Sequence, residues 1–150
     1  MSSRYSQGNY SVQNPEKFVG QKQPFARSSW EMAFMRFCDS HPNITKWASE
    51  NVKIPYRHPF TGKITNYVPD FMVQYTDKTG KTRVDLIEIK PKAQTLQEKA
   101  RDKYDKMSLQ VNAVKWEAAQ AWCKAKGLHF KVITEDQIFR KQTGRKTKRS

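Results

Sequence analysis

The chain has 150 residues, enough for one domain with its own core but too few for two. Its 28 Lys and Arg residues exceed its 14 Asp and Glu residues, and the net charge of +14 predicts a polyanionic partner, with nucleic acid as the default. No apolar run approaches the length of a membrane-spanning helix, and the polar N-terminus lacks the apolar stretch of a secretory signal. We therefore expect no membrane partner and a cytoplasmic location.

The N-terminal part of the chain predicts an arm followed by a helix. Residues 1–23 are rich in Ser, Gln and Asn and hold few apolar residues, so we expect a flexible N-terminal arm, with Tyr5, Tyr10 and Phe18 as candidates to dock it on the body or on a partner. Residues 28–40 have the apolar spacing of a helix that buries one face. Ser28 and Glu31 stand at the spacing of a capping box, in which the Glu31 carboxylate serves the start of the helix.

A β-hairpin is the central prediction of the next segment. A short helix over Asn43–Glu50 and a strand over Val52–Tyr56 are expected to precede it. Ile64–Tyr75 and Thr82–Lys90 are both rich in Val, Ile, Tyr and Phe, with turn residues between them, so they predict the two strands of the hairpin.

The turn residues predict the register of this hairpin. Asp77 and Gly80 fit a type I turn followed by a left-handed residue, which makes a three-residue loop. Counting back from this loop places Asp70 opposite Glu88, with Cβ atoms roughly 4.5–5.5 Å apart. Lys90, two residues beyond Glu88, lies on the same face.

Two acids at this spacing predict a site for a hard cation. Close carboxylates raise each other's pKa unless a cation lies between them, and oxygen ligands without His or Cys suit Mg²⁺ or Mn²⁺. The backbone carbonyl of Ile89 is a candidate third ligand. Two alternatives stay open: a two-residue loop would place Asp70 opposite Ile89 and scatter the site over two faces, or Asp70 and Glu88 are surface acids paired with Lys90 or Arg83.

The C-terminal half predicts helices and one more strand. We expect a weak helix over Thr95–Leu109, a clear helix over Asn112–Lys126 and a strand over Leu128–Thr134 that pairs parallel to the Glu88 strand. A short helix from Thr134 to Phe139 follows, and Arg140–Ser150, with six Lys or Arg and no acid, predicts a basic disordered tail. The order of elements predicts an α/β fold, a mixed central sheet flanked by helices.

The candidate site residues resemble the PD-(D/E)xK nuclease superfamily. Pro69-Asp70 followed by Glu88-x-Lys90 matches its motif, and Glu31 matches the acid that many members carry on a preceding helix. Over most of its length the chain is also similar to the head-completion nucleases of T-even-type bacteriophages, in the segments Arg4–Tyr10, Phe18–Phe37 and Ile54–Gly62.

This resemblance implies a restriction-endonuclease-like core within residues 24–139 and a Mg²⁺- or Mn²⁺-dependent deoxyribonuclease, an endonuclease with exonuclease activity left open. It implies catalytic roles for Glu31, Asp70, Glu88 and Lys90, with Glu31, Asp70, Glu88 and the Ile89 carbonyl at the metal. It further implies head completion and head–tail joining, with DNA and phage head, portal or neck proteins as partners and no small-molecule cofactor. The implied location is the host cytoplasm during assembly, with the virion as a second place.

Basic residues near the motif are candidates for holding DNA: Arg27, Lys92, Arg101 and Lys115, each with the alternative of a solvated surface charge. No recognition-helix motif is visible, so we expect cleavage largely independent of base sequence. Two other functions stay open. One is a non-catalytic basic DNA-binding assembly protein of the phage head. The other is a transposon-end or junction endonuclease on the same core.

Overall fold

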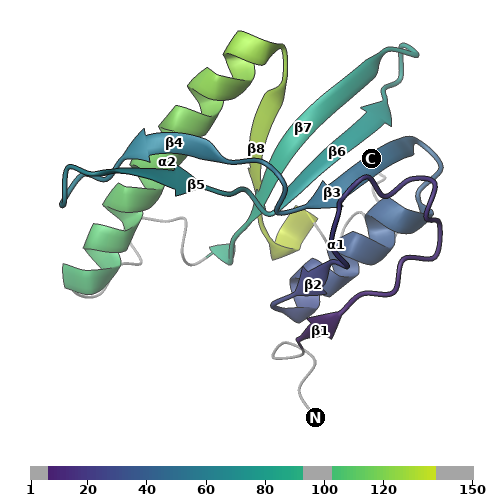
Figure 1. Cartoon of the computed structure of the whole chain (residues 1–150), viewed down its shortest axis with the longest axis horizontal. Coiled ribbons are helices and arrows are strands. Elements are labelled where there is room, and N and C mark those ends of the chain that lie inside the picture. The colour runs from purple at the N-terminus through teal and green to yellow at the C-terminus, as the bar shows by residue number, and fades with distance from the viewer. Residues whose placement is uncertain (1–6, 93–102, 138–150) are drawn as a thin grey trace.

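The computed structural model describes residues 7–92 and 103–137 of the chain. Its elements in chain order are β1 (Gly8–Asn9), β2 (Phe25–Ala26), α1 (Ser29–Ser40), β3 (Ile44–Ser49), β4 (Ile54–Arg57), β5 (Ile64–Tyr67), β6 (Phe71–Thr76), β7 (Thr82–Ile89), α2 (Lys103–Lys126) and β8 (His129–Ile133) (Figure 1). In this described part of the chain, neither helix is long and apolar enough to cross a membrane.

A four-stranded mixed sheet forms the centre of the fold, in the order β3-β6-β7-β8. β3, β6 and β7 pair antiparallel, whereas β8 pairs parallel to β7, as predicted. A parallel neighbour needs a crossover connection, and α2 lies within it. The predicted α/β class, a mixed sheet flanked by helices, is confirmed.

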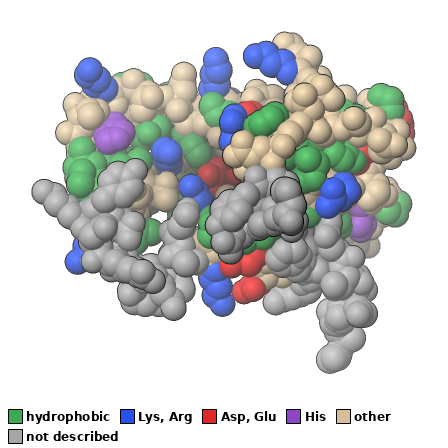
Figure 2. All heavy atoms as spheres, turned by 90° about the horizontal axis from the view of Figure 1, so that it is seen from below, with side chains coloured by type: hydrophobic (Ala, Val, Ile, Leu, Met, Phe, Trp, Pro, Cys, Tyr) green, Lys and Arg blue, Asp and Glu red, His purple; other side chains and the backbone are tan. Residues whose placement is uncertain are grey.

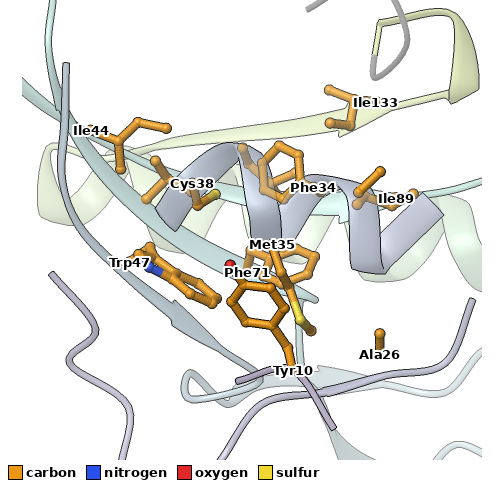
Figure 3. Packing of buried hydrophobic residues seen from close by; sticks show 13 residues of the cluster. Tyr10, Ala26, Phe34, Met35, Cys38, Ile44, Trp47, Phe71, Ile89 and Ile133 are labelled. Carbon is orange, nitrogen blue, oxygen red and sulfur yellow. The ribbon is translucent and has the colours of Figure 1, made fainter. Parts of the chain in front are cut away.

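Each face of the sheet carries its own apolar core. On one face, Phe34 and Cys38 of α1 pack toward Trp47, Phe71 and other sheet residues, as Figure 3 shows. On the other face, α2 and the β4–β5 hairpin cover the sheet (Figure 1), with a core that includes residues 86, 119 and 130. Cys38 lies in the first core and Cys123 in the second, so the sheet separates the two thiols.

The β6–β7 hairpin has the predicted loop and register. The Asp77 N–H donates to the Lys81 carbonyl at 2.9 Å, and Gly80 has a φ of 85°, the left-handed value that favours glycine. Thr76 pairs with Thr82, and the ladder continues in register to the pair Phe71–Ile87. The alternative two-residue loop is thereby excluded, and one further step of the register sets Asp70 opposite Glu88.

Four predicted elements differ in the structure. The helix expected over Asn43–Glu50 is wrong: the segment forms strand β3, because pairing with β6 buries Ile44, Trp47 and Ala48 in the sheet. The strand expected over Ile64–Tyr75 is divided into two strands, β5 and β6. β5 pairs with β4, whereas β6 pairs with β7. Pro69 lies between β5 and β6 and has no N–H for a ladder bond. The two expected later helices correspond, within the described residues, to the single helix α2.

The segment of residues 7–23, expected as part of a flexible arm, packs on the body through Tyr10 and Phe18, two of the residues expected to dock it. Tyr10 is buried, and its hydroxyl donates to the Asp39 carboxylate of α1 at 2.6 Å. The N–H groups of Gln13 and Asn14 donate to the two oxygens of the same carboxylate at 2.7 and 3.0 Å. The Phe18 ring lies 4.8 Å from the Trp47 ring, centroid to centroid. Residues 1–6 and the predicted tail of residues 140–150 lie outside the described residues.

Asp39→Asn should lower the free energy of unfolding at pH 7 by about 2–3 kcal/mol, because a buried carboxylate loses charge-assisted hydrogen bonds. Burial alone raises the pKa of Asp39, but the hydrogen bonds from Tyr10, Gln13 and Asn14 outweigh it and hold the pKa below its ordinary 3.8. The stabilisation is therefore present above pH 3.8 and is lost as the pH falls through the lower, folded-state value.

Denaturant unfolding between pH 3 and pH 7 measures this difference, with Glu117→Gln, an exposed acid on α2, as the charge-matched control. The free energy of unfolding of this control should lie within about 0.5 kcal/mol of that of wild type. Equal free energies for wild type and Asp39→Asn at pH 7 would contradict the structural role of this carboxylate.

Candidate active site

The candidate acids meet where β6 begins and β7 ends. Asp70 directly precedes β6. Glu88 is the second-to-last residue of β7, and Lys90 directly follows that strand. The Glu50 N–H donates to the Asp70 carbonyl at 3.0 Å, which holds the backbone before β6 in place. In the view of Figure 2, acidic side chains lie beside Lys or Arg side chains near the middle of the molecule.

Asp70 and Glu88 interact through their charges. The Asp70 Oδ2 atom accepts the Ile89 N–H at 2.8 Å, which joins the two strand ends. Burial and the negative charge of Glu88 raise the pKa of Asp70 to about 8. Burial also raises the pKa of Glu88, although the Tyr67 hydroxyl and the Lys90 charge oppose the shift. The site therefore holds two acids whose ionised forms lack full compensation from the protein.

Two lysines and a tyrosine surround Glu88. The Tyr67 hydroxyl donates to Glu88 Oε1 at 2.8 Å, and Lys90 Nζ lies 3.8 Å from Glu88 Oε2. Lys115 of α2 has its Nζ 5.6 Å from the centre of the Tyr67 ring. Burial, and then the charge of Lys90, lower the pKa of Lys115. Burial and the Glu88 charge raise the pKa of Tyr67, so its hydroxyl keeps its proton and remains a donor.

Glu31 has a structural contact as well as a place near the acids. Its N–H donates to the Ser28 side chain at 3.2 Å, as the capping box predicts, while its carboxylate accepts the Arg27 N–H at 3.0 Å rather than that of Ser28. Burial raises the pKa of Glu31, and the charges of Glu50 and Glu88 add to this effect. Glu31 therefore interacts electrostatically with Glu88 while its carboxylate holds the backbone of Arg27, just before the start of α1.

The donor atoms at the strand ends fit a hard divalent cation. Asp70 and Glu88 supply carboxylate oxygens, and a cation between them would relieve their repulsion. Within residues 7–92 and 103–137, no three His, Cys, Asp or Glu side chains lie close enough together to hold one ion. A metal here would need backbone carbonyl and water ligands beside Asp70 and Glu88.

The predicted DNA-binding residues are distributed unevenly around this site. Lys115 lies next to Tyr67 and Glu88, as described above. Arg27 pairs with Glu50 at 3.1 Å, and its charge also interacts with Glu31 and Asp70. Lys92 pairs with Asp136 at 3.3 Å. Arg101 lies outside the described residues.

A cavity of about 760 Å³ lies on the other face of the sheet and is separate from these residues. Phe34, Tyr75, Asp85 and Lys131 are among the residues that line it, and Asp70, Glu88 and Lys90 are not. The candidate site is instead defined by its cluster of ionisable groups at the strand ends. The sequence interpretation gave Tyr67 no role beside Glu88, because a contact between β5 and β7 depends on how the β4–β5 hairpin packs.

Comparison with known proteins identifies the family of the chain. Residues 41–135, a range that contains Asp70, Glu88 and Lys90, match the model of the family described as TnsA-like endonuclease N terminal. The chain is also 32% identical over 142 residues to the head completion nuclease of Enterobacteria phage T4, an alignment that covers 87% of this chain and 92% of that protein. These matches confirm the resemblance to PD-(D/E)xK nucleases. The chain therefore belongs to the TnsA-like endonuclease family and has a restriction-endonuclease-like α/β fold.

Proposed function

We propose that this nuclease is a divalent-metal-dependent deoxyribonuclease that cuts DNA largely independently of sequence and acts in phage head completion and head–tail joining. The observation that carries the catalytic part is the Asp70–Glu88 pair, whose charges the protein itself leaves incompletely neutralised. The head completion nuclease of phage T4, similar over most of this chain, supports the biological role.

In the proposed reaction, Asp70 and Glu88 hold Mg²⁺ or Mn²⁺ together with the Ile89 carbonyl. Bound there, the cation would offset charge that develops on the phosphate and would favour ionisation of water. Lys90, which lies on the Glu88 side of the strand end, donates a hydrogen bond to the attacking water or to the scissile phosphate. Glu31 acts as a further ligand of the cation, directly or through water, while its carboxylate also accepts the Arg27 N–H.

Substrate binding in this proposal depends mainly on phosphate contacts. The net charge of +14 supports sequence-independent attraction to DNA, with Lys115 nearest the acids and Arg27, Lys92 and Arg101 as further contacts. The proposed partners are DNA and phage head, portal or neck proteins, in the host cytoplasm during assembly. We also propose that residues 24–139 form the nuclease domain, with residues 7–23 packed against it and the basic tail beyond it.

Incubation of the protein with supercoiled plasmid, with and without EDTA, tests this function. We expect nicked and linear products in Mg²⁺ and none in EDTA. Binding without cleavage in Mg²⁺ or Mn²⁺ would instead identify a non-catalytic assembly protein.

The match to TnsA-like endonucleases favours a second candidate, cleavage at transposon ends or junctions. The cleavage rates on branched and on linear DNA of the same length distinguish this second candidate from the sequence-independent nuclease proposed above. A rate on branched DNA that exceeds the rate on linear DNA more than about tenfold would favour the second, because a factor of ten corresponds to about 1.4 kcal/mol of preference.

Lys90→Ala should lower the cleavage rate about 10²–10³-fold, because it removes a donor aimed at the reacting groups. DNA affinity should stay within a few-fold, since one contact among many phosphates contributes little to binding. Lys81→Ala, an exposed lysine beyond the hairpin loop at the other end of β7, is the control and should cut at the wild-type rate. Cleavage by Lys90→Ala at the wild-type rate would contradict the role of Lys90.

Asp70→Asn should weaken Mn²⁺ binding at least tenfold in calorimetric titration, because one of two charged ligands is lost. Its melting temperature in EDTA should equal or exceed that of wild type, because the change removes repulsion with Glu88. Asp136→Asn, whose side chain is 51% exposed, is the control and should bind Mn²⁺ as wild type does. Unchanged affinity in Asp70→Asn would show that this acid does not hold the cation.

A further inference from the structure

The Tyr67 side chain is fixed on three sides. It is buried on β5, and its ring meets the edge of the Phe130 ring at a centroid distance of 6.1 Å. The Lys115 ammonium lies 5.6 Å from the centre of the ring. The hydroxyl donates to Glu88 Oε1 at 2.8 Å in a buried contact. A ring held in this way can direct its hydroxyl at one atom with little conformational freedom.

The contact makes the two oxygens of Glu88 different. Oε1 accepts the Tyr67 hydroxyl, whereas Oε2 faces the Lys90 side, at 3.8 Å from its Nζ. A carboxylate with a hydroxyl donor at one oxygen and an ammonium beside the other is held in one rotamer, and the rotamer of a metal ligand determines where its free lone pairs point.

We propose that Tyr67 is a positioning residue that acts through Glu88: its hydroxyl fixes Oε1 so that the carboxylate is preset for a divalent cation. The inference rests on the proposed function, in which Glu88 holds that cation. It extends the site to the β4–β5 hairpin, which lies outside the Asp70 and Glu88–Lys90 motif strands and packs on α2. The hairpin and α2 together would then determine the positions of the Glu88 carboxylate and the Lys115 ammonium.

The chain contains a matched control for this arrangement. Tyr75 on the opposite face of the sheet also lies near a buried acid, Asp85, whose charge helps to raise the pKa of Tyr75, and the Lys131 Nζ lies 5.8 Å from the centre of its ring. Tyr67→Phe and Tyr75→Phe therefore remove the same atom near a buried acid and a lysine, although Tyr75 is only partly buried. Only Tyr67 contacts a proposed metal ligand.

Tyr67→Phe should weaken Mn²⁺ binding about 10–100-fold in calorimetric titration, the usual loss when a partner of a metal ligand is removed. The Mn²⁺ affinity of Tyr75→Phe should stay within twofold of that of wild type. The Mg²⁺ concentration for half-maximal cleavage should rise by the same factor in Tyr67→Phe, while the rate at saturating Mg²⁺ stays within about threefold. Both variants keep the ring, and their melting temperatures in EDTA should lie within a few degrees of wild type.

A ¹⁹F spectrum of protein labelled with 3-fluorotyrosine gives a second readout that does not depend on cleavage. The resonance of each tyrosine is assigned by its absence from the spectrum of the corresponding Tyr→Phe variant. In wild type, Mg²⁺ should shift the Tyr67 resonance and leave the Tyr75 resonance unchanged. Wild-type Mn²⁺ affinity in Tyr67→Phe would overturn the inference. Equal losses of affinity in both variants, with lowered melting temperatures in EDTA, would also overturn it, since they indicate a structural role.

Glu88→Gln distinguishes failure of this inference from failure of the proposed function. If Glu88→Gln loses Mn²⁺ binding while Tyr67→Phe keeps it, only the role of Tyr67 is wrong. If wild type and Glu88→Gln bind Mn²⁺ equally weakly and neither cuts DNA, the proposed function is wrong and the inference falls with it.

Discussion

Repulsion between two carboxylates at the junction of β6 and β7 is the constraint on which the site depends. Asp70 and Glu88 are brought together by the register of one hairpin, and burial prevents water from fully screening their charges. A folded protein gains nothing from such a pair by itself, because each charge makes the other more costly. The arrangement is favourable when a cation completes it, and this links the architecture of the sheet to phosphodiester chemistry.

The rest of the fold holds this pair in position from both faces of the sheet. On one face, α1 packs through Phe34 and its neighbours and brings Glu31 to the strand ends, while the Asp39 network secures the preceding segment to the same helix. On the other face, the β4–β5 hairpin and α2 bring Tyr67 and Lys115 to Glu88. The acids therefore lie where two separately packed layers meet, so a change in either layer can alter the site.

Local chemistry made part of this structure predictable. Asp77 and Gly80 determine a loop through contacts within four residues, and that loop fixes which face each later side chain occupies. The path of residues 7–23 was not predictable, because its anchor, Tyr10 to Asp39, joins positions 29 residues apart. Strand β3 was missed for a similar reason: polar residues surround Trp47, and only pairing with β6 shows which of them face the core. Tyr67 contacts Glu88 across 21 residues through the packing of a second hairpin.

The two faces of the sheet show why one buried acid belongs to a site and another does not. Asp85 and Glu88 are both buried on β7, and each has a tyrosine hydroxyl and a lysine as neighbours. Lys131 Nζ lies 2.8 Å from Asp85 Oδ2, an ion pair that offsets the negative charge within the protein. The Lys90 ammonium is 3.8 Å from Glu88, and the Asp70 carboxylate is close enough to add a second negative charge. The same side-chain types thus form a closed ion pair on one face and an electrostatically incomplete site on the other, and the difference is the second acid that the hairpin register delivers.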